Sequence, residues 1–504
     1  MKQESAWELP HPPSFPPVLK DLYADVLVIG AGVTGITAAY LVAKTGRSVI
    51  VLEKGKLCGG ETKHTTAHIS YPTDARLGDL VRKFGRNHAE AVWDACHAAA
   101  EQIRHNILTE QIACELRHVP GYLYAAENAK TREIDSLQQD ARLAREMGFD
   151  AAFVECCPLT RRPAVRFSNL MKFHPTQYVV HLAQAAGQLG CQIHEESEVT
   201  EFDAEGLSVH CNGHRVSCRH VFIATHVPLQ GVSGLLSATL LQTKLAGYST
   251  YAVQAHLPLG LPEALWWDTA NPYFHLRADI TTTGVRVIAG GEDHKTGQNH
   301  DTEDSYHALS SHLQAIAPTA RIVRRWSGQV IETVDGLPYI GEHAGQFIAT
   351  GFSGTGITYG TLAAMMFLDH VEGITNPWQD LFHIERKELS SSWNYLKENK
   401  DYPYYLTKSL FMGENRDPND LVSGEGAVLR RHGKRIAASR DSHGKLTLLS
   451  AICPHMGCVV GWNTADHTWD CPCHGSRFTA QGEVMAGPAE SPLEPVRDDP
   501  AKEA

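Results

Sequence analysis

The alternation of apolar and polar positions along the chain predicts two kinds of folding unit. Residues 24–52 form the pattern of a short strand, a glycine-rich turn, a helix and a second strand. Residues 76–110 and 130–147 carry apolar positions at helical spacing with charges between them. Residues 249–255 and 284–288 are β-rich runs that favour an antiparallel sheet. We therefore expect an α/β (α+β) fold in the first two thirds of the chain.

Changes in composition divide the 504 residues, which are too many for one hydrophobic core, into four parts. Residues 1–23 are rich in proline and predict an extended segment on the surface. Residues 24–371 predict the α/β unit, with an antiparallel-sheet subdomain at about 150–195 and 235–330. Residues 372–418 mix polar residues with aromatic residues and predict a connector packed on a surface. Residues 419–504 combine short strands with Gly and Asp turns, which predicts a small all-β domain.

The net charge and the distribution of cysteines indicate which partners and which cellular compartment to expect. The net charge is −12 and no basic stripe is present, which argues against a nucleic-acid partner. Residues 26–43 are apolar enough to span a bilayer, but their glycine pattern and the absence of a signal-like leader favour a buried strand and helix. Eight cysteines are scattered over the first half without the spacing of a disulfide framework, as is typical of a reducing compartment. We expect a cytoplasmic protein without an integral membrane segment.

Two short motifs near the C-terminus carry the most specific chemistry. Cys453-Pro-His455 and Cys471-Pro-Cys473-His474 each supply one cysteine and one histidine. Two thiolates on one iron and two imidazoles on the other form the ligand set of a Rieske [2Fe–2S] centre. Zinc is the competing metal, but zinc fingers separate their Cys pair from their His pair. The assigned ligands are Cys453, His455, Cys471 and His474.

The same motifs resemble those of cytochrome-bc-type Rieske proteins. In those proteins the cysteines that correspond to Cys458 and Cys473 form a disulfide between the two cluster loops; two buried free thiols are the alternative. Ser476 matches a serine that hydrogen-bonds the cluster in the high-potential proteins, whereas Phe478 replaces their tyrosine. The resemblance therefore implies a potential below that of respiratory Rieske proteins, within the window of about −150 to +300 mV.

A dinucleotide-binding motif begins the α/β unit. Gly30-Ala31-Gly32-Val33-Thr34-Gly35 follows a predicted strand and opens a helix, and Glu53 ends the next strand about twenty residues later. The glycines let backbone N–H groups reach a pyrophosphate, and the acid accepts from a ribose hydroxyl. The motif alone does not separate NAD from FAD.

Three later segments resemble the D-amino-acid-oxidase/glycine-oxidase/sarcosine-oxidase superfamily and favour FAD. They are residues 198–199, residues 221–225, and residues 335–341 with 349–358, and the resemblance covers roughly residues 24–370. It implies a two-dinucleotide-binding-type FAD domain with an inserted antiparallel-sheet substrate domain. The residues that it places around FAD, with those of the glycine motif, are Gly30, Ala31, Gly32, Thr34, Gly35, Glu53, Lys54, Thr62, His64, Thr65, Thr66, Ala67, Val199, Ala224, Thr225, Gly351, Gly354, Thr355, Gly356 and Ile357.

His64 has two interpretations. In the dimethylglycine-dehydrogenase branch of the superfamily, a histidine in a similar frame bonds the flavin covalently, and His64 falls at that place. The alternative, which we prefer, is a hydrogen-bonding histidine whose neighbours Thr65 and Thr66 cap a helix or bond the flavin.

The fusion of the two halves resembles a bacterial group of FAD-dependent oxidoreductases with a C-terminal Rieske domain. The leading hypothesis is oxidation of a small amine or amino acid at FAD, with single electrons passing through the cluster to a redox partner protein or other acceptor. Arg277 is the candidate for pairing a substrate carboxylate, with His174, His275 and Tyr359 as weaker pocket candidates. Two rival hypotheses are an electron-transfer protein without an organic substrate, and an oxidase that uses O₂ and keeps the Rieske domain for docking.

Overall fold

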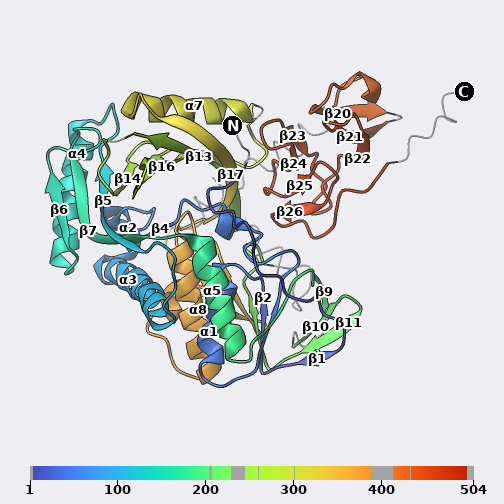
Figure 1. Ribbon diagram of the computed structural model, residues 1–504, viewed down its shortest axis with the longest axis horizontal. Coiled ribbons are helices and arrows are strands. Elements are labelled where there is room, and N and C mark those ends of the chain that lie inside the picture. Colours follow the sequence, from blue (N-terminus) through green and yellow to red (C-terminus); the bar gives the residue numbers. More distant parts are fainter. Residues whose placement is uncertain are drawn as a thin grey trace, which may run out of the picture.

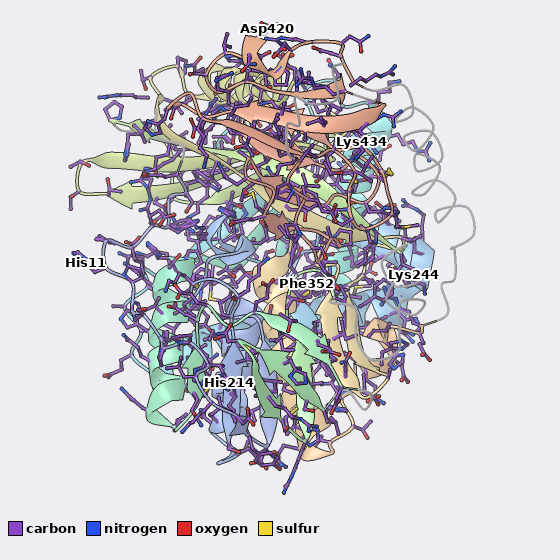
Figure 2. All side chains as sticks on the ribbon, turned by 90° about the vertical axis from the view of Figure 1, so that its right-hand side faces the viewer. His11, His214, Lys244, Phe352, Asp420 and Lys434 are labelled. Carbon is purple, nitrogen blue, oxygen red and sulfur yellow. A yellow bond between two sulfur atoms is a disulfide. The ribbon has the colours of Figure 1, made fainter. Side chains whose placement is uncertain are left out.

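The fold was analysed in a computed structural model, which describes residues 4–203, 207–228, 244–258, 260–299, 301–386, 413–431 and 433–496. Figure 1 shows a nucleotide-binding half below, a large curved sheet above it, and a C-terminal all-β part beside that sheet. Figure 2 shows the C-terminal residues Asp420 and Lys434 at one end of the molecule, with Phe352 near the middle and His214 toward the other end. The predicted α/β unit with a separate C-terminal all-β part is confirmed.

A six-stranded sheet forms the centre of the nucleotide-binding half. Side chains of β2 alternate between its two faces, so that Val26 and Val28 pack on helices while Leu27 and Ile29 pack on a small second sheet. Both faces are therefore covered, and the central strands β2 (Val26–Ile29) and β3 (Val49–Leu52) are continuous buried apolar runs. The strand order is β18 (Tyr339–His343), β19 (Gln346–Thr350), β12 (His220–Ile223), β2 (Val26–Ile29), β3 (Val49–Leu52) and β8 (Gln192–His194). The helices are α1 (Val33–Ala43), α3 (Arg86–Thr109), α5 (Pro175–Gln188) and α8 (Gly356–Glu372), and the small sheet is β1 (Leu22–Tyr23), β11 (His214–Ser217), β10 (Ser208–Cys211) and β9 (Val199–Phe202).

The predicted antiparallel sheet is part of a nine-stranded sheet in which one pair, β14 (Leu265–Asp268) and β5 (Arg117–Tyr124), is parallel. Its long strands β13 and β16 contain the two β-rich runs seen in the sequence, and each extends beyond them. The order is β17 (Arg321–Thr333), β13 (Leu245–Leu257), β16 (Gly284–Lys295), β15 (Phe274–Thr281), β14 (Leu265–Asp268), β5 (Arg117–Tyr124), β7 (Ala164–Lys172) and β4 (His68–Ile69), with β6 (Ala151–Val154) beside β7. Helix α7 (Thr302–Ile316) packs on β13 and β16, and α2 (Leu77–Phe84) and α4 (Thr131–Glu146) pack together near β6 and β7.

Two short antiparallel sheets make up the C-terminal part. The first is β20 (Gly426–Arg431), β21 (Lys434–Arg440) and β22 (Leu446–Ser450). The second is β23 (Gly461–Asn463), β24 (Thr468–Asp470), β25 (Arg477–Thr479) and β26 (Val484–Ala486). The two predicted cluster motifs fall between β22 and β23 and between β24 and β25. Figure 1 places β23–β26 next to β17 of the large sheet.

The proline-rich stretch of the N-terminal extension is extended and mostly exposed, as predicted, but the chain ahead of it enters the core. Trp7 is completely buried, and its Nε1 donates a hydrogen bond to the carbonyl oxygen of Thr65 at 2.6 Å. The guanidinium of Arg277 lies 5.0 Å from the Trp7 ring centre, and that of Arg286 lies 5.6 Å from it. Burial of a large aromatic side chain such as Trp7 stabilises the fold, and this outweighs the preference of the proline-rich residues beside it for water. The extension is therefore part of the fold.

Two expectations concern the connector and the membrane. Most of the predicted connector, residues 387–412, lies outside the described residues. Within the described ranges, no helix combines the length and the apolar character needed to cross a bilayer.

Candidate functional site

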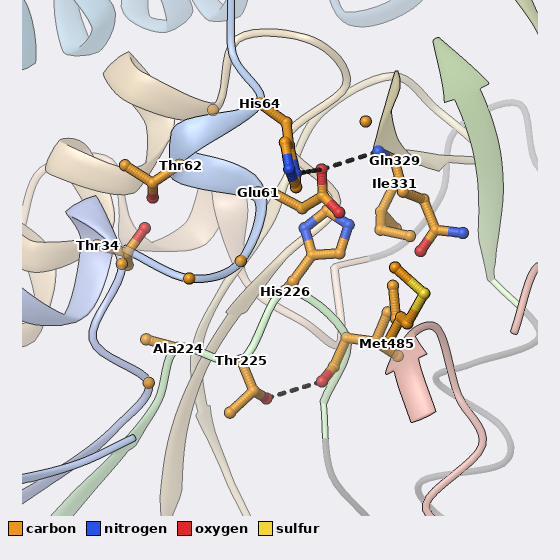
Figure 3. A pocket seen from close by; sticks show the side chains of 18 of the residues that line it. Thr34, Glu61, Thr62, His64, Ala224, Thr225, His226, Gln329, Ile331 and Met485 are labelled. Atoms are coloured by element: carbon orange, nitrogen blue, oxygen red, sulfur yellow. Dashed lines mark hydrogen bonds and ion pairs between the residues drawn. The ribbon is translucent and has the colours of Figure 1, made fainter. Parts of the chain in front are cut away.

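A cavity of about 800 Å³ lies between the nucleotide-binding sheet, the large sheet and the segment 484–490 of the C-terminal part. Figure 3 shows it from close by, with Met485 reaching toward it from β26. The residues predicted to hold the dinucleotide that line it are Gly30, Gly32, Thr34, Glu53, Lys54, Thr62, His64, Thr65, Thr66, Val199, Ala224, Thr225, Gly354, Gly356 and Ile357. The remaining predicted residues, Ala31, Gly35, Ala67, Gly351 and Thr355, do not line it.

The glycine turn before α1 fits a pyrophosphate. Gly30 has a φ of +105°, and a Cβ on it would lie 2.6 Å from the carbonyl oxygen of Ala224. A Cβ on Gly35 would collide with the carbonyl oxygen of Gly30, so the helix can approach the turn only because Gly35 has no side chain. The first turn of α1 contains no acidic residue. The backbone N–H groups and the positive end of the helix therefore suit the phosphates of a dinucleotide.

Glu53 lies at the edge of the same cavity. Its two carboxylate oxygens accept hydrogen bonds from the backbone N–H groups of Ala31 (2.9 Å) and Gly55 (2.8 Å). These bonds fix the carboxylate and leave lone pairs for a ribose hydroxyl. The neighbouring Lys54 donates from Nζ to the carbonyl oxygen of Val484 at 3.4 Å, which brings the C-terminal part to the nucleotide end of the cavity.

A carboxylate lies at the other end of the cavity, between two histidines. Figure 3 shows Glu61, at the start of the 3₁₀ turn η1 (Glu61–Lys63), close to His64 and His226. Its Oε2 accepts from the backbone N–H of Gln329 at 2.8 Å and lies 3.8 Å from Nδ1 of His64. Burial alone would raise the pKa of Glu61, but the nearby His64 imidazole, His226 and the Gln329 N–H together lower it to about 2. The carboxylate is therefore ionised.

His64 lies in the cavity wall, as the resemblance implied. Its carbonyl oxygen accepts from Nε1 of Trp326 at 2.8 Å, and the adjacent carbonyl of Thr65 accepts from Trp7. Two buried indoles thus fix the backbone of the segment that is expected to contact the flavin. The covalent and the hydrogen-bonding interpretations of His64 both remain predictions.

The start of β15 and the residue before it contribute two aromatic side chains to the wall. Tyr273 and His275 both line the cavity, with ring centres 5.4 Å apart. Burial lowers the pKa of His275 to about 4, so the imidazole is neutral. Burial, and then the charges of Asp74 and Asp293, raise the pKa of Tyr273. Burial also raises the pKa of Asp74 well above its usual range and that of Asp293 to about 6, so this end of the cavity has neutral rings and carboxyls shifted toward the protonated form.

Arg277 does not face the cavity, although the sequence suggested it as the partner of a substrate carboxylate. Its side chain is 1% exposed. Nε donates to Asp279 at 2.9 Å, and Nη1 donates to the carbonyl oxygens of Ala67 and Phe173 at 3.0 and 2.8 Å. These contacts give the guanidinium a structural role, and we do not retain it as a substrate anchor.

The three weaker pocket candidates also differ in whether they face the cavity. His275 lines the cavity, whereas His174 and Tyr359 do not. His174 caps α5, with Nδ1 accepting from the N–H of Gln177 at 3.3 Å. Tyr359 is 1% exposed within α8.

The four predicted cluster ligands come together in the C-terminal part. Cys453 and Cys471 are each 1% exposed and share a hydrogen bond. That bond is the main reason why the pKa of Cys453 falls to about 7, while it raises the pKa of Cys471. The rings of His455 and His474 lie 4.9 Å apart, and burial lowers the pKa of each to about 4. Two adjacent thiols and two neutral imidazoles are the donor set that a Rieske cluster requires.

A disulfide joins Cys458 and Cys473, with a Cα–Cα distance of 6.5 Å. The Sγ atoms of Cys458, Cys471 and Cys473 all lie within 4.8 Å of one another, but the two in the disulfide cannot serve as thiolate ligands. Ser476 is completely buried, and its Oγ accepts from the N–H of Ala489 at 3.1 Å. Its hydroxyl also hydrogen-bonds the thiol of the predicted ligand Cys453, which helps to lower the pKa of that thiol.

The second cluster loop packs against the large sheet. Nε2 of Gln329 donates to the carbonyl oxygen of Gly475 at 2.7 Å, and Nε2 of Gln298 donates to that of Pro472 at 3.0 Å. At the β23–β24 turn, Asp466 accepts from Ser327 at 2.5 Å and pairs with Arg477 at 2.8 Å. Strand β17 therefore contacts both the cavity and the second cluster loop.

Sequence reasoning did not find Glu61, His226, Gln329 or the segment 484–490. Glu61 belongs to the small-residue segment that the sequence placed beside the flavin, so its position gave a signal. His226 follows the predicted flavin strand and has a φ of +69°. Gln329 and segment 484–490 carry no motif, because their role depends on how the two halves pack.

Comparisons with known proteins agree with this division. Residues 25–369 match the family model of FAD dependent oxidoreductases, and residues 415–497 match that of the Rieske [2Fe-2S] domain. The protein YhfW of Bacillus subtilis (strain 168), which is named as a Rieske 2Fe-2S iron-sulfur protein, is 31% identical over 497 residues, covering 96% of this chain and 95% of its own length. The cytochrome b6-f complex iron-sulfur subunit of Synechococcus sp. (strain JA-3-3Ab) is 52% identical over 87 residues, which are 17% of this chain and 41% of that subunit.

Two solved structures share the fold of the first part. Glycine oxidase from Geobacillus kaustophilus superposes with a TM-score of 0.61 at 19% identity, covering 73% of this chain and 99% of that one. L-Proline dehydrogenase from P. horikoshii gives a TM-score of 0.60 at 19% identity, covering 74% and 100%. At this identity the likeness concerns the fold.

Proposed function

We propose a function from the premise that this chain belongs to the family of FAD-dependent oxidoreductases and carries a Rieske [2Fe–2S] domain. It oxidises a small amine or amino acid in the FAD cavity and passes the electrons singly through the Rieske cluster to an external acceptor. The observation that carries this proposal is the shared strand β17. Gln329 on this strand lines the cavity and bonds the second cluster loop.

The chemistry of each group explains why the two belong together. FAD, when bound, accepts two electrons at once, whereas the cluster carries one. Oxidation of an amine R₂CH–NH₂ to the imine R₂C=NH releases two protons and two electrons. Two molecules of a one-electron acceptor are then needed for each amine oxidised.

The surroundings of Tyr273 favour an amine over a carboxylate as the recognised group. The Arg277 guanidinium already bonds Asp279 and two carbonyl oxygens, so it does not pair with a substrate carboxylate. Asp74 packs directly against Gly354, which lines the cavity, and Asp293 influences Tyr273 through its charge. A carboxyl oxygen accepts a hydrogen bond from an amine N–H in either protonation state, and an ionised carboxyl attracts an ammonium and repels a free carboxylate. We therefore place amines without a carboxylate first among the substrates.

Anaerobic stopped-flow mixing with a panel of amines and amino acids tests this proposal. We expect loss of the oxidised-FAD absorbance first and cluster reduction afterwards, with amines faster than the corresponding amino acids. Bleaching by NAD(P)H but by no amine would instead indicate an electron-transfer protein without an organic substrate. Hydrogen peroxide formation at full rate in Cys471→Ser would indicate an oxidase that does not need the cluster.

A further inference from the structure

One side chain connects the FAD cavity to the cluster loop. Gln329 on β17 is 3% exposed. Its backbone N–H donates to Oε2 of Glu61 in the flavin-side segment at 2.8 Å. Its side-chain Nε2 donates to the carbonyl oxygen of Gly475 at 2.7 Å and to Oγ1 of Thr296 at 3.2 Å. Figure 3 shows the bond to Glu61 at the cavity wall.

The stability of the fold does not explain why residue 329 carries a side-chain amide. Its Oε1 is buried and accepts no hydrogen bond from any described residue. A buried polar atom without a partner costs free energy, so a side chain of the same length without polar atoms would satisfy the packing better. What the amide adds is a pair of hydrogen bonds, to Gly475 and to Thr296, and the bond to Gly475 is the one that reaches the cluster loop.

The two cluster loops have different surroundings. The second loop lies against the large sheet: a Cβ on Gly297 would lie 2.7 Å from the carbonyl carbon of Cys471, and one on Gly475 would lie 3.2 Å from Cα of Gly247. The first loop is open, with Ile452 and Met456 39% and 37% exposed. The loop that carries His474 is therefore the covered one and the loop that carries His455 is the open one, with both histidines partly buried.

We propose that Gln329 is the positioning residue of the electron crossing, so that electrons enter the cluster at the His474 side and leave at the His455 side. From Glu61 the path runs through one hydrogen bond to Gln329, along its covalent chain, and through a second hydrogen bond to Gly475. Gly475 is bonded covalently to His474. The inference rests on the proposed function for the origin of the electrons and for the external one-electron acceptor that receives them.

The chain offers a matched control. Gln298 donates to the carbonyl oxygen of Pro472 in the same loop at 3.0 Å, but it does not line the FAD cavity. Methionine has nearly the length of glutamine and donates no hydrogen bond. Gln329→Met keeps the backbone bond to Glu61 and removes the side-chain bonds to Gly475 and Thr296, of which only the first reaches the cluster loop. Gln298→Met removes the side-chain bond to Pro472.

The test uses the full-length holoprotein and no organic substrate. Electrons are delivered to FAD by light with a deazaflavin donor, and the rise of the reduced-cluster EPR signal gives the rate of crossing. In Gln329→Met we expect this rate to fall about tenfold, which is ~1.4 kcal/mol of barrier. Amide hydrogen exchange of residues 471–476, measured by mass spectrometry, is expected to accelerate, while Gln298→Met keeps the native crossing rate.

Three results would overturn the inference. A native crossing rate in Gln329→Met would show that the bond to Gly475 does not matter. Equal slowing in Gln298→Met would assign the effect to loop anchoring in general. A changed cluster potential that accounts for the slower rate would assign it to driving force rather than to position. Failure of every amine to bleach FAD would refute the proposed substrate class but leave the light-driven rates, and thus this inference, testable.

Discussion

Asp466→Asn should destabilise the contact between the FAD-binding part and the C-terminal part more than the removal of an exposed charge does. Asp466 at the β23–β24 turn accepts from Nη2 of Arg477 at 2.8 Å and from Oγ of Ser327 at 2.5 Å. The substitution keeps the shape and removes the charge. Arg477, whose side chain is 6% exposed, is then left with Asp470 at 3.2 Å as its ionised partner.

The magnitude follows from the burial of this group. Burial alone would lower the pKa of Arg477, but the charges of Asp470 and Asp466 raise it, so the guanidinium depends on both. Removing one member of a buried pair costs about 3–5 kcal/mol, and the remaining Asp470 should reduce this to about 2–3 kcal/mol. The pair of Arg416 and Glu425, each 30% exposed, is the control, and Glu425→Gln should cost about 0–1 kcal/mol.

Urea unfolding measures both variants. The visible circular dichroism of the cluster reports the C-terminal part, and FAD fluorescence reports the cavity. We expect Asp466→Asn to lower the midpoints of both signals, because the group lies between the halves, and Glu425→Gln to leave the FAD signal unchanged. Equal, small losses in the two variants would refute the reasoning that Asp466 belongs to a buried interface network.

Three further predictions concern other residues. Trp7→Ala should cost about 3–5 kcal/mol in thermal or urea unfolding, because a buried indole and its bond to Thr65 are lost; an unchanged midpoint would contradict the packing described here. The pKa of His174 is lowered to about 4, mainly by burial, from about 6.5 in the unfolded chain, so its stabilising contribution is complete above pH ~6.5 and is lost as the pH falls toward 4. His174→Asn retains a cap for Gln177 and should flatten this acid limb of the unfolding curve. After acid precipitation we expect all FAD in the supernatant, and yellow colour in the pellet would instead indicate a covalent bond to His64.

The sequence predicted those features that depend on local patterns. The glycine turn with Glu53 and the two Cys–His motifs have fixed spacings, because each binds its group within one turn or loop. The predicted cluster ligands and the disulfide cysteines therefore come together as expected. Arg277 shows the limit of such reasoning: a lone arginine on a predicted strand gives no information on which partners the fold will bring to it.

Contacts between the halves could not be predicted. Gln329, Asp466 and the segment 484–490 have ordinary local sequences, and their roles arise from packing of the C-terminal part on β17. Trp7 was missed for a related reason, since the prolines around it indicated an exposed path. Its burial depends on a space left by Arg277, His174 and Thr65, which lie far away in the chain.

Because the second cluster loop packs on the large sheet, the rate of electron transfer between the two sites should not depend on the protein concentration. A carrier that diffuses between partners slows as it becomes scarce, whereas two sites on one chain keep a constant effective concentration. The hydrogen bonds from Gln329 and Gln298 go further and fix the orientation as well. Only the collision of an acceptor with the open loop at Ile452 and Met456 should then depend on concentration.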